Sequence, residues 1–190
     1  QGKVISLWDR SGDLIDSLSL ENRVIEARVL PQSKKLLVYD DSKDLTLVNL
    51  EDKSAQSLSG HEFPISAIAI TEDGKFFLSG DLGGTTILWN NDGTLLQQLD
   101  AHAEAISSLC FTRAGQQWVS GGMDGKVHLF SREGEKLATY SHPAKVTALT
   151  VIPNDTFLLA GLRNGEIWEW SFAGQHLSSY IGHRKRVNAI

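Results

Sequence analysis

Three residues in the middle of the chain have the side-chain types of an activated nucleophile. His102, Ser120 and Asp124 supply an imidazole, a hydroxyl and a carboxylate, the groups that many hydrolases combine as base, nucleophile and orienting acid. If the three met in one cleft, they would predict acyl transfer or hydrolysis. Their role therefore depends on the elements that position them.

The histidines and the single cysteine are the other candidates for chemistry. Four histidines recur at a period near forty residues: His61, His102, His142 and His183. In successive repeats they would lie too far apart to share one ion. His128 and His176 have no Cys or His neighbour at ligand spacing, and Cys110 is interpreted as a packing residue. The sequence predicts no catalytic residue, no metal site and no cofactor.

Composition narrows the class of protein. The chain has 190 residues, of which 41% are hydrophobic and 22% charged, as in globular domains. Its 18 basic and 23 acidic residues give a net charge of −5, which makes nucleic acid an unlikely main partner. One cysteine cannot form an internal disulfide, so we expect a reducing, cytoplasmic location. No apolar run is long enough for a membrane span, and no leader opens the chain, which starts with Gln rather than Met.

An internal repeat determines the expected fold. A large residue closes a short apolar segment at intervals of 40, 41, 41 and 40 residues: Trp8, Val48, Trp89, Phe130 and Trp170. Four residues after each comes a turn residue: Gly12, Asp52, Gly93, Gly134 and Gly174. A residue with positive φ at such a place reverses the chain in a β-hairpin. Each repeat therefore contains at least one hairpin.

The segments between these landmarks are short and rich in Ile, Val, Leu and Thr. In one repeat they are 65–71, 76–81, 85–90 and 95–100, which predicts four strands. No segment has a convincing helical period, so no helix is expected. Four short strands repeated about every forty residues are typical of propeller blades.

These residues carry a family resemblance. Gly60-His61 and Gly182-His183 open repeats, and Trp8-Asp9 closes one. With weaker forms of the closing pair at the later landmarks, the chain resembles the WD-repeat (WD40) β-propeller family over its whole length. The sequence at 92–96 resembles the strand ends of bacterial WD-repeat arrays. The resemblance implies an all-β propeller with four complete four-stranded blades and partial blades at both ends, part of a larger ring that in this family commonly has seven blades.

Aligned repeats give the expected boundaries. Residues 1–20 would end one blade, 21–59, 60–100, 101–141 and 142–181 would be full repeats, and 182–190 would start another. An open array leaves two apolar sheet faces exposed to water. The stabilising free energy that is then not gained is on the order of 10 kcal/mol, which is comparable with the stability of a whole domain. We therefore expect further blades from the same longer chain or from a partner chain.

The resemblance also assigns the polar trio a structural role. In this family a buried His, Ser or Thr, Asp and Trp form a tetrad, with Ser ten and Asp six residues before Trp. By position the members are His61, Ser79, Trp89, His102, Ser120, Asp124, His142 and Trp170. Gly83 stands where one Asp belongs and Phe130 where one Trp belongs. In the last full repeat two tetrad positions hold Ala160 and Asn164. In the first full repeat the four tetrad positions hold Glu21, Val38, Ser42 and Val48. No tetrad is then complete, and the 101–141 repeat would be the best clamped.

Partner binding is expected at one end of the propeller. In the family, partners meet residues just before the first strand and just before the tetrad Asp. By position these form an apolar zone, Pro64, Leu82, Ala105 and Met123, and a basic zone, Lys145, Arg163, Arg184, Lys185 and Arg186. Residues 142–190 hold five basic and three acidic residues, which supports the distinction between an apolar and a basic zone. The basic zone can equally be a solvated charge run.

The leading hypothesis is a non-catalytic scaffold or sensing module for protein–protein interaction in a larger cytoplasmic protein. One alternative is a reader of an acidic, phosphorylated or nucleic-acid ligand through residues 142–186. Another is an enzyme that uses the central channel. That would require inward carboxylates or histidines, and the first strands offer mainly small or aliphatic residues, with Glu26 and Arg28 as exceptions.

Overall fold

The computed structural model describes residues 4–19, 23–152 and 156–190, and these contain strands but no helix. In chain order the strands are β1 (Val4–Trp8), β2 (Leu14–Ser19), β3 (Val24–Val29), β4 (Lys35–Asp40), β5 (Leu45–Asn49), β6 (Ala55–Leu58), β7 (Ile65–Ile70), β8 (Phe76–Asp81), β9 (Thr85–Asn90), β10 (Leu95–Asp100), β11 (Ile106–Phe111), β12 (Gln117–Gly122), β13 (Lys126–Ser131), β14 (Lys136–Ser141), β15 (Val146–Val151), β16 (Phe157–Leu162), β17 (Glu166–Ser171) and β18 (His176–Ile181). Nothing in the described segments is a helix with the length and apolar character to cross a bilayer.

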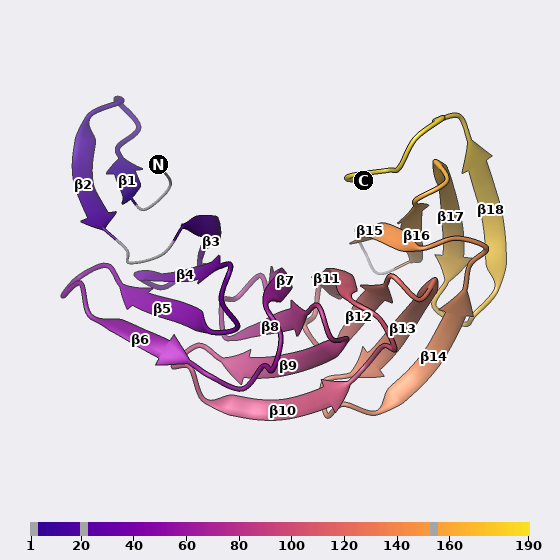
Figure 1. Cartoon of the computed structure of the whole chain (residues 1–190), viewed down its shortest axis with the longest axis horizontal. Helices are drawn as coiled ribbons and strands as arrows, with labels where there is room; N and C mark the ends of the chain where they lie inside the picture. Colours follow the sequence, from indigo (N-terminus) through magenta and orange to yellow (C-terminus); the bar gives the residue numbers. More distant parts are fainter. Residues whose placement is uncertain (1–3, 20–22, 153–155) are drawn as a thin grey trace.

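The strands form four sheets of four antiparallel strands and one sheet of two. Each four-stranded sheet is a meander: β3–β6, β7–β10, β11–β14 and β15–β18, with β1 and β2 paired on their own. The sheets stand side by side along an arc, with β1–β2 at one end and β15–β18 at the other (Figure 1). The predicted all-β class with four four-stranded blades is confirmed.

Hairpins end the third strand of each sheet, as the repeat predicted. Gly12, Gly93, Gly134 and Gly174 have φ values of 89, 89, 84 and 89°. Asp52 lies in the turn, as predicted, but the positive φ of that hairpin, 60°, is at Lys53. The reason is an extra residue in the loop. Asn49 N–H bonds to the carbonyl of Ser54, five residues on, whereas Asn90 N–H bonds to Thr94, four residues on.

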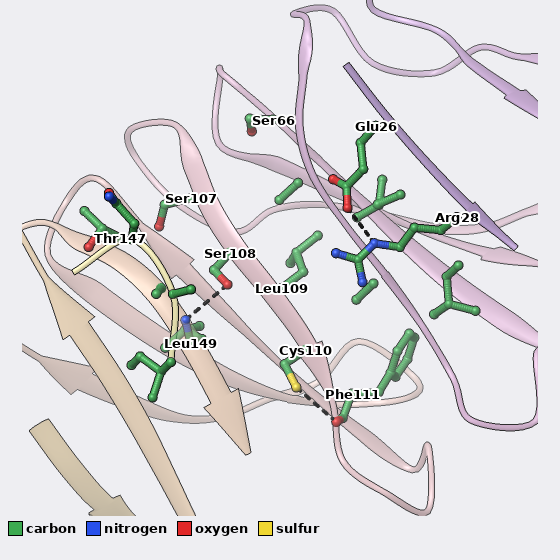
Figure 2. A pocket seen from close by; sticks show the side chains of 18 residues that line it. Glu26, Arg28, Ser66, Ser107, Ser108, Leu109, Cys110, Phe111, Thr147 and Leu149 are labelled. Atoms are coloured by element: carbon green, nitrogen blue, oxygen red, sulfur yellow. Dashed lines mark hydrogen bonds and ion pairs between the residues drawn. The ribbon is translucent and has the colours of Figure 1, made fainter. Parts of the chain in front are cut away.

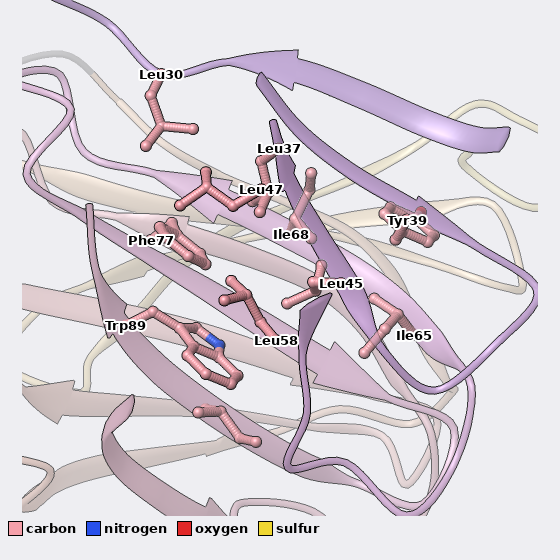
Figure 3. Close-up of a cluster of buried hydrophobic side chains, with 11 residues drawn as sticks. Leu30, Leu37, Tyr39, Leu45, Leu47, Leu58, Ile65, Ile68, Phe77 and Trp89 are labelled. Carbon is pink, nitrogen blue, oxygen red and sulfur yellow. The ribbon is translucent and has the colours of Figure 1, made fainter. Parts of the chain in front are cut away.

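The core consists of apolar layers between neighbouring sheets. Between sheets β3–β6 and β7–β10, eleven buried residues pack together, and Leu37, Leu45 and Phe77 are 0% exposed (Figure 3). Comparable clusters join β7–β10 to β11–β14 and β11–β14 to β15–β18. A smaller one joins β1–β2 to β3–β6. Burial on both faces is what allows these short strands to be largely apolar, because each central sheet is covered from both sides.

Residues 182–190 form no strand, although the sequence suggested the start of one. A first strand draws its hydrogen bonds from the second strand of its own sheet, and residues 182–190 have no such neighbour in the structure. Val187 nevertheless packs against Gly161 of β16 as Ile106 packs against Gly80 of β8. A Cβ at either glycine would lie within 2.8 Å of the facing side chain.

Candidate binding face and buried histidine networks

The sheet β7–β10 holds a complete four-residue network. Nδ1 of His61 lies 2.9 Å from Oδ2 of Asp81, and Nε2 lies 2.7 Å from Oγ of Ser79. The indole N–H of Trp89 donates to the same hydroxyl at 2.8 Å. With Asp81 as acceptor, His61 donates from Nδ1 and accepts the Ser79 proton at Nε2. The chain Trp–Ser–His–Asp ties the loop before β7 to β8 and β9.

The expectation that Gly83 leaves this network incomplete was therefore wrong. The carboxylate comes from Asp81, two residues earlier, at the end of β8. Asp81 also accepts the backbone N–H groups of Gly83 and Thr85, both at 2.9 Å, so it shapes the β8–β9 hairpin while it orients His61. Counting back from Trp89 could not find it, because either of two hairpin positions can reach the histidine.

In the sheet β11–β14 the carboxylate comes from the later of these two hairpin positions, Asp124. His102 bonds to Ser120 Oγ at 2.8 Å and to Asp124 at 3.0 Å. Phe130, in place of the tryptophan, stacks on Trp118 with ring centroids 4.2 Å apart. The prediction that this repeat is the best clamped was wrong, because the network of β7–β10 has one more member.

The outer sheets depart further from the pattern. In β15–β18, where Ala160 replaces serine, Trp170 donates its indole N–H directly to Nε2 of His142 at 3.0 Å. In β3–β6, Val38 and Val48 belong to the small apolar cluster against β1–β2. Glu21 lies outside the described residues. The networks thus weaken from the centre of the array towards its ends.

Burial keeps the network histidines neutral. It lowers the pKa of His61 and His102 despite their aspartate partners, which act in the opposite direction. It lowers the pKa of His142 to about 4, with the Gly125 carbonyl opposing. For His128 the pKa falls to about 4, chiefly through burial, and electrostatic interaction with His102 and Lys136 adds to the effect. Neutral rings are what these hydrogen bonds require.

These shifts predict loss of stability in mild acid. The pKa of an unfolded histidine is about 6.5, so below that pH the unfolded chain binds more protons than the folded one and stability falls. The expected loss from His128 and His142 together is about 4 kcal/mol between pH 7.5 and 5. Asp73, with its pKa lowered to about 2 by hydrogen bonds from Lys75 and Thr71, contributes only at lower pH.

Urea unfolding followed by tryptophan fluorescence at pH 7.5 and 5.0 measures this loss. His183→Gln is the control, because that side chain is exposed and its removal should leave the pH dependence unchanged. Equal unfolding free energies at the two pH values would contradict the assignment of neutral buried rings.

The hydrolase interpretation of the His–Ser–Asp trio is not supported by its surroundings. Ser79 and Ser120 are both 0% exposed, so a substrate carbonyl has no access to either hydroxyl. A nucleophile must be within reach of the group that it attacks. In the structure the trio links the loop before β11 to β12 and to the β12–β13 hairpin.

The proposed partner positions are paired by the backbone. Leu82 N–H bonds to the carbonyl of Pro64 at 3.0 Å, and Met123 N–H bonds to Ala105 at 2.9 Å. Each hairpin between the second and third strands thereby lies beside the loop that precedes its own first strand. Leu82 is 53% exposed and Phe63 is 50% exposed. The repeat pattern does not point to Phe63, although a large aromatic residue beside Pro64 in a polar loop is a signal for it.

The basic positions are brought together by the same contact. Arg163 N–H bonds to the carbonyl of Lys145 at 2.9 Å. The next turn packs on the loop 183–185, since a Cβ on Gly165 would lie 2.2 Å from the His183 carbonyl oxygen and 2.9 Å from that of Lys185. Arg163, Arg184 and Lys185 are exposed. Lys145 differs from them, because Nζ is 2.5 Å from a carboxylate oxygen of Glu104.

A cavity lies along the first strands of the four-stranded sheets, and Figure 2 shows the side chains that line it. Its volume is about 590 Å³ and it is lined by residues of β3, β7, β11 and β15 and by Asn188–Ile190. Its two charged lining residues, Glu26 and Arg28, are paired with each other at 2.5 Å. The described lining thus offers no pair of carboxylates or histidines for acid–base catalysis in the channel.

Comparison with known proteins agrees with this architecture. Residues 48–170 match a family model described as the IP5P C-F β-propeller. The chain is also 30% identical over 76 residues to a WD repeat-containing protein WDS homolog of Arabidopsis thaliana, over 39% of this chain and 14% of that protein. The chain thus spans a small part of the length of that relative. WD-repeat propellers in general mediate protein interactions.

The matched region runs from the landmark Val48 to the landmark Trp170, through the sheets in which the histidine networks are found. The repeat, the meander sheets, the inter-sheet cores and the family match all lead to one assignment. The chain belongs to the IP5P C-F β-propeller family and has WD40-type blades.

Proposed function

We propose that this chain is a non-catalytic platform that binds an acidic or phosphorylated segment of a partner protein. The observation that supports the proposal is a backbone bond between the hairpin and the inter-blade loop of the same sheet, found in β7–β10, β11–β14 and β15–β18. In our proposal both zones belong to one face. The apolar zone is Phe63, Pro64, Leu82, Ala105 and Met123, and the basic zone is Arg163, Arg184, Lys185 and Arg186, with Lys145 held by Glu104.

The chemistry of the two zones supports a peptide-like ligand. Arginine binds carboxylate and phosphate groups with two parallel hydrogen bonds, and exposed apolar side chains such as Leu82 and Phe63 would anchor the flanking residues. The chain as a whole is acidic, with a net charge of −5, which disfavours a long nucleic acid as the main ligand.

A peptide array tests the proposal. Wild-type protein is applied to synthetic segments that are acidic, phosphorylated or neutral, and we expect retention on the first two classes. Arg163→Glu combined with Arg186→Glu should reduce retention at least about tenfold, because two cation contacts become repulsive. Lys75→Glu is the matched control, since Lys75 is exposed and lies in the β7–β8 hairpin at the opposite end of the sheet.

Retention unchanged in the double variant would overturn the basic zone as the site. Binding that disappears steeply with salt and prefers oligonucleotides over every peptide would instead favour a nucleic-acid reader.

We also propose that further blades cover the two outer sheet faces, from the same longer chain or from a partner chain. Support comes from the apolar residues exposed there. Trp8 and Ile15 are 61% and 67% exposed on the β1–β2 sheet, and Ile181 is 79% exposed at the end of β18. A cytoplasmic location fits a chain with one cysteine.

A further inference from the structure

Three side chains of the β11–β14 sheet gather in a way that the blade period does not predict. His102 comes from the loop before β11, Asp124 from the β12–β13 hairpin and His128 from β13. One ligand atom of each lies within 4.8 Å of the ligand atoms of the other two. The imidazole rings of His102 and His128 are 4.5 Å apart between centroids. His128 reaches this place because it is the cross-strand partner of Ser120, the clamp serine.

A hydrogen bond fixes the orientation of the second imidazole. Nδ1 of His128 contacts Oγ1 of Thr139 at 2.9 Å, which orients the ring and leaves Nε2 for a ligand bond. Such an outer hydrogen bond is the usual support of a metal-binding histidine.

The spacing of the first two groups fits a tetrahedral ion. Nδ1 of His102 and Oδ1 of Asp124 are 3.0 Å apart, while two ligands of a tetrahedral Zn²⁺ are separated by about 3.3 Å. An ion could replace the shared proton with a small movement. Asp124 keeps its backbone bonds from Ala103 and Lys126. The proton of His102 then resides on Nε2, and this N–H donates to the hydroxyl oxygen of Ser120.

Gly122 allows the two ligand groups to lie together against the backbone. A Cβ there would lie 2.3 Å from Nδ1 of His102 and 2.5 Å from Oδ1 of Asp124, so a side chain at this position would displace the pair. In the neighbouring sheet the equivalent position is Asp81 itself, which is 0% exposed. With the carboxylate at Asp124 instead, the acid lies at a partly exposed place. Lys126 and Lys136 are the cations that oppose binding, as their effect on His128 indicates.

We propose that His102, Asp124 and His128 form a binding site for a divalent transition-metal ion of the zinc type, with water as the fourth ligand. Two imidazoles and one carboxylate suit zinc, which in sites with three protein ligands keeps one position open. The site adjoins the proposed partner-binding face, because Asp124 follows Met123 in the β12–β13 hairpin and His102 lies in the same loop as Ala105. The ion would strengthen the one central clamp that lacks its tryptophan.

The test is titration of the complete, tag-free chain with Zn²⁺ by calorimetry, and with Co²⁺ by its visible absorption. We expect one equivalent bound with a dissociation constant below about 10 µM and a higher melting temperature with zinc. His128→Ile should weaken binding by at least about 100-fold, since loss of even an outer partner costs 10 to 100-fold. This variant should fold, because Ile87 occupies the equivalent place in β9.

Two further variants separate this site from other histidines. Asp124→Asn should lower the affinity and remove the Co²⁺ band of a tetrahedral site. The double variant His176→Gln and His183→Gln alters exposed rings and should keep the full affinity. The proposal would be overturned if the wild type bound no equivalent of zinc. It would also be overturned if folded His128→Ile still bound one equivalent of zinc.

Discussion

Gly84→Ala is expected to lower the melting temperature by about 10 °C or more. Gly84 has a φ of +95°, and a Cβ would lie 2.2 Å from the backbone oxygen of His102 in the next sheet. Gly84 also accepts backbone hydrogen bonds from Ala101 and His102 at 3.0 Å. The positive φ and the clash with rigid backbone together should destabilise the fold by about 4 kcal/mol, which for a chain of this size corresponds to that shift.

Gly174→Ala is the matched control. Its φ is +89°, but a Cβ there meets nothing within 4 Å, so only the backbone strain of about 1 kcal/mol remains. Circular dichroism melts of the two variants compare these values directly. Equal shifts would show that the contact between neighbouring sheets contributes nothing.

Asp81→Ala is expected to cost about 3 to 5 kcal/mol of unfolding free energy. The carboxylate is fully buried and accepts three hydrogen bonds, from His61, Gly83 and Thr85. Its removal leaves these donors without a partner in a site that water does not reach. Urea unfolding monitored by tryptophan fluorescence at pH 7.5 is the measurement.

Asp124→Ala provides the comparison within the same chain. Asp124 also bonds to a network histidine, but its side chain is 10% exposed, so water can take over part of its role. We expect a loss of about 2 kcal/mol, clearly smaller than for Asp81. The reverse order would mean that the 101–141 repeat is the better clamped after all.

The repeat in the sequence was sufficient to predict the sheets. The landmarks Trp89 and Phe130 lie at the same place in the third strand of their sheets because each must fill the same space against its neighbour. Such periodic packing is visible in one sequence, since it needs only side-chain size at a fixed interval. The positive φ at Lys53 was not predicted, because one additional loop residue leaves the period of the strands unchanged.

The polar sites were harder to predict, because they depend on neighbours across strands. Asp81 was missed because a hairpin can supply its carboxylate from either of two positions. His128 was judged isolated because its neighbour His102 lies 26 residues away in sequence and meets it only after β12 and β13 pair. The contact of Lys145 with Glu104 likewise joins two different sheets, which residue spacing within one repeat does not reveal.

The bonds between the hairpin of one sheet and the loop of the next have an evolutionary consequence. His102 N–H bonds to Gly84 in one junction, and His142 N–H bonds to Gly125 in the following one. Donor and acceptor come from the same two places in both of these units of about forty residues. Duplication or loss of a whole unit would therefore regenerate a working junction. The gene can thus lengthen or shorten in modular steps while the junction chemistry stays the same.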